Sequence, residues 1–103
     1  MKVLAIDMDG TLAHENKWRG IGHFGEPINE TVNDLLRERE NGARIIIHTC
    51  RINGTKKFPM SWQKKNIERW LKHHNIPYDE IWTGRGKPEA DEYWDNKAVR
   101  KGI

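Results

Sequence analysis

The chain alternates between short apolar runs and longer segments in which apolar residues recur at helical spacing. The runs at residues 2–7 ("KVLAID") and 43–49 ("ARIIIHT") lack a 3.6-residue period, which predicts strands buried on both faces. Shorter stretches at 78–83 ("YDEIWT") and 92–94 ("EYW") predict a third and a fourth strand, because aromatic and β-branched residues favour a pleated surface.

Two segments between these strands have apolar residues on one helical stripe. The first helix has Asn29 as a candidate N-cap and ends near Gly42. The second has Ser61 as a candidate cap and ends by Pro77. The two stripes consist of Val32, Leu35, Leu36 and Arg39, and of Ile67, Trp70, Leu71 and His74. Strands that alternate with such helices predict right-handed βαβ crossovers, and therefore a three-layer α/β fold with a parallel sheet.

Two further segments have neither period. Residues 13–27 are rich in glycine and end with Pro27, which predicts a loop or flap. Residues 51–60 contain Gly54 and Pro59 and predict a second loop. Neither segment is long enough to hold a second core, so residues 1–103 are expected to form one domain.

Charge and composition narrow the classes of function only slightly. Lysine and arginine number 18 against 15 acidic residues, so the net charge is 18 − 15 = +3, and the sequence pI is about 9.1. This balance favours anionic ligands. The densest basic stretch contains Arg51, Lys56, Lys57, Lys64 and Lys65. A solvated loop and helix face is the ordinary interpretation of such a stretch, and it does not by itself indicate nucleic-acid binding.

Cysteine usage and the amino-terminal segment bear on the compartment. Cys50 is the single cysteine, so the fold cannot depend on an internal disulfide, and a reducing cytoplasm is the expected location. The apolar run before Asp7 is too short for a signal-peptide core or a membrane span. We therefore expect a cytoplasmic protein with no membrane partner.

An acidic pair stands at the end of the first predicted strand. Asp7 and Asp9 are two residues apart, so on an extended backbone their side chains point the same way. Two carboxylates this close are unfavourable unless a cation or a shared proton lies between them. Because ligands collect at the carboxyl ends of parallel strands, the other strand ends matter too. They carry Thr49, the segment from Thr83 to Lys87, and Asp95.

Several segments match the signatures of a known family. The segment "DMDGT" at 7–11 resembles the first signature of the haloacid-dehalogenase-like (HAD) superfamily. Later signatures are similar and occur in order: "IIIHT" at 45–49, Lys87 in "GKP", and "EYWDNKA" at 92–98. The resemblance covers nearly the whole chain and implies a three-layer, Rossmann-like domain with a parallel sheet of about four strands. It also implies a magnesium-dependent phosphatase that hydrolyses a phosphate monoester.

The resemblance implies a covalent mechanism. Asp7 would be the nucleophile that attacks phosphorus and becomes an aspartyl-phosphate. Asp9 would protonate the leaving oxygen and then activate the water that breaks this intermediate. Thr49 and Lys87 would also be catalytic, because they would hold the charged phosphoryl oxygens.

Metal and substrate ligands follow from the same resemblance. Mg²⁺ would be bound by the carboxylates of Asp7 and Asp95 and by the main-chain carbonyl of Asp9. Gly10 and Thr11 would line the substrate site, with Gly10 allowing backbone N–H groups to approach an anion.

The last signature departs from the family pattern. Small relatives usually carry two acidic residues there, and the second position of this chain is Asn96. An amide oxygen can still bind a cation but lacks the charge that strengthens a magnesium site. Asp91 could contribute only if the backbone brings it near, and a cap or surface role is its ordinary interpretation. His48 is interpreted as a core histidine that faces away from the site, and Cys50 as an inert thiol.

No insertion is long enough for a cap domain, so the resemblance is to capless members. Such members act on large or extended phosphorylated substrates, or are closed over by a partner subunit. The covering elements here would be the flap 13–27 and the loop 51–60. We expect Arg19 and Arg51 in these elements to bind the phosphate or its leaving group, with solvated arginines as the alternative.

Several functions remain open at this point. The leading hypothesis is a phosphatase whose phosphorylated substrate is a nucleotide, a nucleic-acid end or a related molecule. The alternative that Asn96 favours is a catalytically weak or inactive module that binds phosphate or metal, and a nucleic-acid-binding module is another. The sequence also ends soon after the last signature, and the expected exposed sheet edge motivates a homodimer as a further hypothesis.

Overall fold

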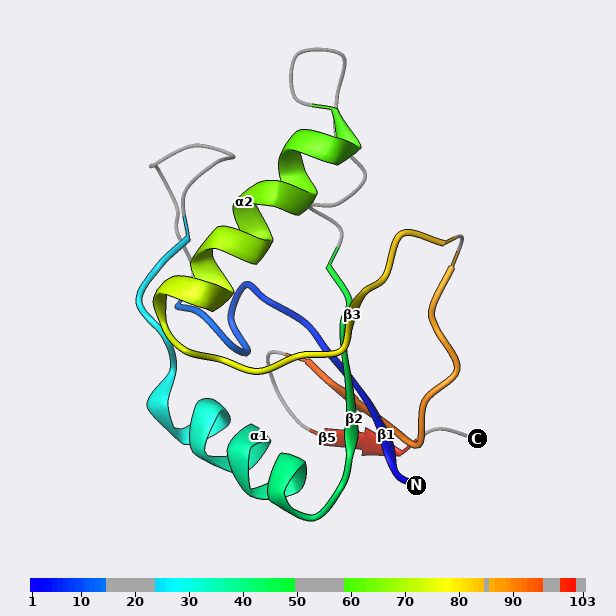
Figure 1. Ribbon diagram of the computed structural model, residues 1–103. Coiled ribbons are helices and arrows are strands. Elements are labelled where there is room, and N and C mark those ends of the chain that lie inside the picture. Colours follow the sequence, from blue (N-terminus) through cyan, green and yellow to red (C-terminus); the bar gives the residue numbers. More distant parts are fainter. Residues whose placement is uncertain (15–23, 50–58, 85, 96–98, 102–103) are drawn as a thin grey trace.

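The computed structural model describes residues 1–14, 24–49, 59–84, 86–95 and 99–101. Their elements follow the order β1, α1, β2, α2, β3, β4, β5 and include one five-stranded sheet (Figure 1). The strands are β1 (Val3–Ile6), β2 (Arg44–Ile47), β3 (Glu80–Ile81), β4 (Glu92–Trp94) and β5 (Val99–Lys101). The helices are α1 (Asn29–Glu40) and α2 (Met60–His73).

The sheet has the strand order β3-β2-β1-β4-β5, and its first four members are parallel. The predicted α/β fold with four parallel strands is thus confirmed. β5 is an addition that the sequence did not predict, and it pairs antiparallel with β4. Its sequence, "VRK", shows no apolar alternation, so only the backbone pairing reveals it. β5 covers the edge of β4 that was expected to be exposed, and a homodimer stays a prediction.

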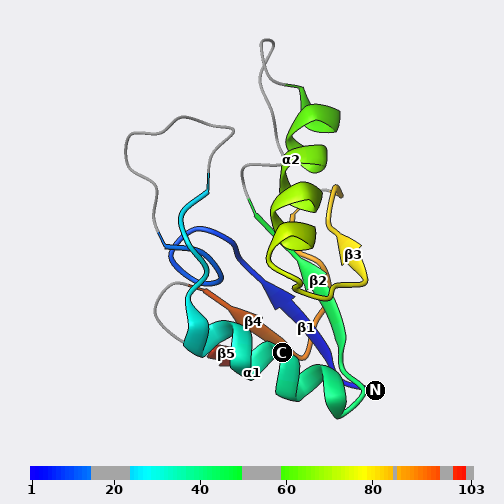
Figure 2. The ribbon, with the colours of Figure 1, turned by 60° about the vertical axis from the view of Figure 1, so that its left-hand side comes forward.

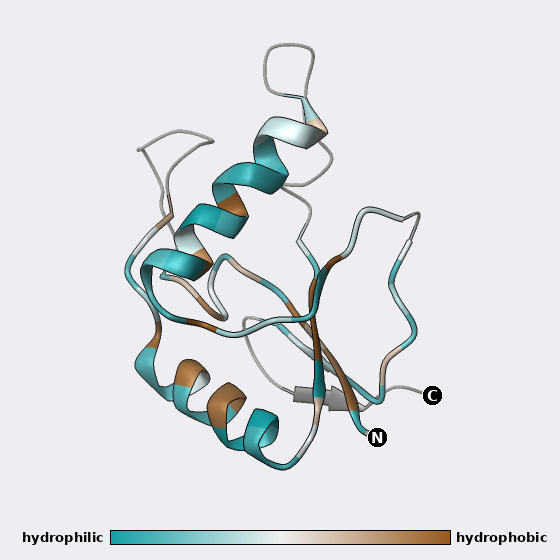
Figure 3. Ribbon diagram, in the orientation of Figure 1, coloured by the Kyte–Doolittle hydropathy of each residue, from teal (hydrophilic) through white to brown (hydrophobic). Residues whose placement is uncertain are grey.

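One face of the sheet packs against both helices. Leu4 and Ile6 of β1 stand opposite Ile45 and Ile47 of β2, and all four side chains are fully buried. Directly opposed residues share a face of the sheet, so these four form one apolar layer. The helices complete this core with Leu35 from α1 and with Ile67, Trp70 and Leu71 from α2. The hydrophobic stretches of β1 and β2 can be followed in Figure 3.

The second face of the sheet is covered without a helix. Ala5 and Ile46 stand opposite each other on this face and are 2% and 5% exposed. The described parts of the connection from β3 to β4, residues 82–84 and 86–91, run on the side of the sheet away from α1 and α2 (Figure 1). A right-handed crossover that returns past β1 requires this side. The third layer of the described structure is therefore an extended segment, where such folds usually have a helix.

The helix starts differ from the predicted caps. The N-cap positions are Ile28 and Pro59, and neither helix has a side-chain cap hydrogen bond. Asn29 and Ser61 are therefore already helical residues. The φ of Pro59, −67°, suits entry into a helix without a polar cap. The stop near Gly42 is confirmed, and the φ of 88° at this glycine belongs to the left-handed region that ends many helices.

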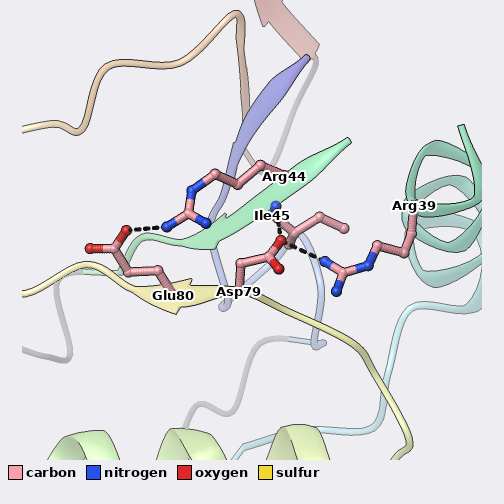
Figure 4. A network of polar contacts seen from close by, with 5 residues as sticks. All are labelled: Arg39, Arg44, Ile45, Asp79 and Glu80. Carbon is pink, nitrogen blue, oxygen red and sulfur yellow. Dashed lines mark hydrogen bonds and ion pairs between the residues drawn. The ribbon is translucent and has the colours of Figure 1, made fainter. Parts of the chain in front are cut away.

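Ionic contacts join α1, β2 and β3 at the amino edge of the sheet (Figure 4). The carboxylate of Asp79 accepts a hydrogen bond from the Ile45 N–H at 2.8 Å and another from the Arg39 guanidinium. Arg44 pairs with Glu80 at 3.0 Å. Burial alone would raise the pKa of Asp79, but the Ile45 N–H and the Arg39 charge lower it overall. This edge is thus a place where acids are paired with donors and cations.

The base of the flap is a short ladder beside α2 (Figure 2). The His14 N–H donates to the Glu26 carbonyl at 2.9 Å, and the Ile28 N–H donates to the Leu12 carbonyl at 2.8 Å. From the helix side, Nε1–H of Trp70 donates to the Gly25 carbonyl at 3.1 Å. The described part of the flap 13–27 is therefore anchored to the core.

Gly25→Ala should destabilise the protein, because the two sides of this ladder approach too closely for a side chain. A Cβ at position 25 would lie 2.3 Å from the His14 carbonyl oxygen, which belongs to the backbone and cannot rotate away. We expect the free energy of unfolding, measured by urea denaturation, to fall by about 1–3 kcal/mol. The exposed neighbour provides the control, since Glu26→Ala should change stability by less than about 0.5 kcal/mol. Equal stability of Gly25→Ala and the wild type would contradict the close approach.

Candidate active site

The chain turns sharply as it leaves β1. The Met8 carbonyl accepts hydrogen bonds from the N–H groups of Thr11, Leu12 and Ala13 at 3.2, 3.0 and 2.9 Å. Gly10 has a φ of 79° in this turn, a value that residues with a side chain rarely adopt. The side chain of Met8 is fully buried in the core. The turn leaves the carboxylates on either side of Met8 at the carboxyl edge of the sheet.

The register of the sheet brings the predicted acids together. At the carboxyl edge, the Asp7 N–H donates to the Trp94 carbonyl at 3.0 Å. Asp7 is therefore the neighbour of the strand end that carries Asp95. On the other side of β1, the His48 N–H donates to the Ile6 carbonyl at 2.9 Å.

Asp7 is a half-buried carboxylate in an acidic environment. Burial raises its pKa above the usual range, and the negative charges of Asp9 and Asp95 raise it further. A hydrogen bond from the Met8 N–H to Oδ1, 2.7 Å long, opposes this shift. Three of the predicted site residues therefore lie close enough to act on one another's charge.

All the predicted metal ligands near Asp7 are oxygen atoms. In the part of the chain that the structure describes, no three side chains of His, Cys, Asp or Glu are grouped so that they could hold a metal ion. The predicted set has two carboxylates, from Asp7 and Asp95, and the main-chain carbonyl of Asp9. Mg²⁺ takes oxygen ligands and usually keeps several waters, so such a set fits its chemistry. The magnesium site stays a prediction.

The two threonines among the predicted phosphate ligands are more enclosed than the acids. Thr49 is 3% exposed at the end of β2. Oγ1 of Thr11 is buried and has no hydrogen-bond partner among the described residues. The N–H groups of Gly10 and Thr11 donate to the Ala13 and Met8 carbonyls within the turn. Contacts of these residues with a substrate stay predictions.

Lys87 lies on the second face of the sheet, in the segment that connects β3 to β4. Its Nζ is 5.4 Å from the centre of the Tyr93 ring, and none of the described carboxylates forms an ion pair with it. Burial lowers the pKa of the half-buried His48, and the charge of Lys87 lowers it further. His48 is thus close enough to feel the charge of Lys87. The direction in which its side chain faces relative to the site stays a prediction. Tyr93 was not predicted as a site residue.

Other predicted residues fall elsewhere. The carboxylate of Asp91 accepts a hydrogen bond from the Val3 N–H at 2.7 Å, at the amino end of β1. This is the edge opposite to Asp7, so the structural interpretation of Asp91 is confirmed. Predictions for Arg19, Cys50, Arg51 and Asn96 concern residues outside the described part of the chain.

The protein is similar to several solved structures in its three-dimensional fold. No family model and no curated protein matches the sequence. The crystal structure of an MCSG target from Vibrio cholerae is 29% identical with a TM-score of 0.63, and the match covers 97% of this chain and 84% of that one. A conserved protein from Bacteroides thetaiotaomicron has a TM-score of 0.66 at 19% identity, covering 94% and 77%. A chain in the structure of a Pnkp1/Rnl/Hen1 complex has a TM-score of 0.61 at 20% identity, covering 85% of this chain and 31% of that chain.

These similarities concern the fold. The third neighbour is similar over about a third of its own length, and its identity of 20% carries no further information on function. Among the described elements, neither helix combines the length and the apolar character that crossing a lipid bilayer requires. The chain has a small α/β, Rossmann-like fold, and its structural neighbours are consistent with the HAD-like fold that the sequence resembles.

Proposed function

We propose that this protein is a magnesium-dependent phosphatase of the HAD type, which hydrolyses a phosphate monoester through an aspartyl-phosphate at Asp7. One observation carries the proposal: the half-buried Asp7 carboxylate has a raised pKa and feels the charges of Asp9 and Asp95. Asp79 shows the contrast, because its pKa is lowered by a cation and a donor, as is typical of a structural acid. Ionisable groups perturbed by like charges concentrate at functional sites.

One hydrogen bond distinguishes the two carboxylate oxygens of Asp7 in the proposed reaction. The Met8 N–H holds Oδ1, so Oδ2 is the oxygen that attacks phosphorus. As the new bond forms, the bond from phosphorus to the leaving oxygen breaks, and that oxygen takes a proton from Asp9. Asp9 then accepts a proton from water, whose oxygen attacks the phosphorus. Inorganic phosphate leaves, and the Asp7 carboxylate is regenerated.

The remaining predicted residues would neutralise and position the phosphoryl group. Lys87 and Thr49 supply a cation and a hydroxyl for the phosphoryl oxygens, whose charge is spread in the transition state. Gly10 and Thr11 line the same edge. When bound, Mg²⁺ supplies further positive charge at these oxygens, held by the two carboxylates and the carbonyl named above.

The proposed substrate class follows from the net charge and from the lack of a segment that could form a cap domain. The net charge of +3 favours an anion, and no segment of the chain is long enough for a cap domain. Both features support a phosphorylated substrate that is large or extended, such as a nucleotide or a nucleic-acid end, recruited by Arg19 and Arg51. We also propose a cytoplasmic location. The structural neighbours share the fold and do not choose among substrates.

The mechanism predicts that Asp7→Asn abolishes turnover. With Mg²⁺ and a generic aryl phosphate, the wild type should release phosphate, and Asp7→Asn should be slower by about 10³-fold or more, because an amide cannot form the covalent intermediate. Lys87→Ala should be slower by about 10²-fold. The exposed Glu89→Gln removes the same charge as Asp7→Asn and should leave the rate unchanged.

Two outcomes would contradict the proposed mechanism. Turnover by Asp7→Asn at the wild-type rate would exclude Asp7 as the nucleophile. An inactive wild type that also fails to bind Mg²⁺ together with beryllium fluoride, a phosphate mimic, would exclude the phosphatase and would leave the nucleic-acid-binding module as the alternative.

The crowding of acids also predicts an effect on stability. Because the pKa of Asp7 is raised in the folded state, its ionised form destabilises the protein once the pH exceeds that pKa. At pH 7 with a chelator, Asp7→Asn should therefore raise the Tm, by a few degrees if the gain is about 1 kcal/mol or less. Asparagine Oδ1 can still accept the Met8 N–H.

The sign of this effect follows from linkage. The advantage of Asp7→Asn should shrink as the pH falls through the raised pKa toward the ordinary aspartate value, since the wild-type carboxyl is then protonated in the folded protein. Glu89→Gln should show neither the gain at pH 7 nor its loss in acid. A lower Tm for Asp7→Asn than for the wild type at pH 7 would show that the ionised Asp7 carboxylate does not destabilise the fold.

A further inference from the structure

The segment that carries Lys87 is pinned to the second face of the sheet. Pro88 is fully buried, although Lys87 and Glu89 on either side of it are exposed. A buried residue between two exposed ones holds the backbone against the sheet while the neighbouring side chains stay in contact with solvent. The backbone of Lys87 is thus fixed, but its flexible side chain is ordered only if a further residue contacts it.

Trp82 holds the first half of this segment. Its Nε1–H donates to the Gly86 carbonyl at 2.9 Å, directly before Lys87. The indole ring also lies against Gly84, where a Cβ would be 2.6 Å from Cζ2 of the ring. Gly86 has a φ of 65°, which allows the turn that follows. The indole therefore contacts the backbone at both Gly84 and Gly86.

Tyr93 holds the second half and the ammonium itself. Its Oη donates to the Pro88 carbonyl at 2.6 Å, directly after Lys87. The Lys87 Nζ lies over the face of the same ring at 5.4 Å, within the range of a cation–π contact. Tyr93 stands opposite Ala5 on β1, so its ring shares the face of the sheet that Lys87 occupies.

From these contacts we infer that Tyr93 and Trp82 are positioning residues for Lys87, an inference that rests on the proposed function. The two rings hold the backbone on either side of Lys87, and the Tyr93 ring also contacts the ammonium. A lysine side chain that is already ordered loses less freedom when a phosphoryl group arrives. Neither ring takes part in the bond changes.

The test is a double-mutant cycle between Tyr93 and Lys87. Tyr93→Leu should lower kcat by roughly five- to thirty-fold in the chain with Lys87, because the ammonium loses the ring. In the Lys87→Ala background the same substitution should have almost no further effect, since there is no ammonium left to hold. Tyr93→Phe keeps the ring and loses only the bond to Pro88, so its effect should be smaller. An equal loss in both backgrounds would mean a merely structural role and would overturn the inference.

A second readout does not depend on turnover. The rate at which an amine-reactive acetylating reagent modifies Lys87 can be followed by mass spectrometry, with the exposed Lys72 of α2 as the internal reference. Tyr93→Leu should raise the rate at Lys87 by roughly two- to five-fold and leave Lys72 unchanged, whereas Tyr93→Phe should stay near the wild type. Trp82→Phe, which removes the bond to Gly86, should also raise it and serves as the second variant if Tyr93→Leu does not fold. Unchanged labelling in folded variants would overturn the inference.

The two readouts separate the failure of this inference from the failure of the proposed function. If the wild type shows no phosphatase activity but Lys87 labelling responds to Tyr93→Leu, the positioning of Lys87 stands and the proposed function falls. If Lys87→Ala lowers turnover while the Tyr93 variants change neither turnover nor labelling, the proposed function stands and the positioning role falls.

Discussion

The pairing of β1 with a parallel neighbour on each side is the constraint on which the rest of the structure depends. Ile6 stands opposite Ile47 of β2 and Trp94 of β4, so the residues that follow on all three strands must emerge together. This register places Asp7 beside the strand end that carries Asp95. It also buries the apolar layer that the helices cover, so the core and the acidic cluster arise from a single alignment of backbone hydrogen bonds.

The two edges of the sheet treat charge in opposite ways. At the amino edge, Lys2 forms ion pairs with Glu38 and Glu92 at 3.1 and 3.0 Å. Arg39 forms an ion pair with Asp79. Glu38, Glu92 and Asp79 are thus each offset by a cation of the same chain, and Asp91 accepts a backbone N–H. At the carboxyl edge, burial and neighbouring acids make it harder to ionise Asp7. An edge of that kind is poorly suited to a purely structural role and well suited to a ligand that brings positive charge.

The sequence was informative where the determinant is local. Four parallel strands follow from short apolar runs, and the described structure agrees. The two-residue spacing predicted that Asp7 and Asp9 lie close together, and the charge of Asp9 does act on Asp7. It was uninformative where the determinant is a tertiary contact. β5 is defined by pairing with β4 and not by its own residues, and the polar caps predicted for the helices were replaced by Ile28 and Pro59. The relation of Lys87 to Tyr93 likewise exists only because a helix-free connection crosses the sheet.

That connection has a consequence for the mobility of Lys87. Residues 82–84 and 86–91 run along the face of the sheet that holds the buried Ala5 and Ile46, and they include Lys87. Swinging them outward would wet an apolar sheet face and withdraw the lysine at once, at a cost in hydrophobic free energy that no other described layer on this face could offset. The position of Lys87 is therefore tied to the burial of this face of the sheet.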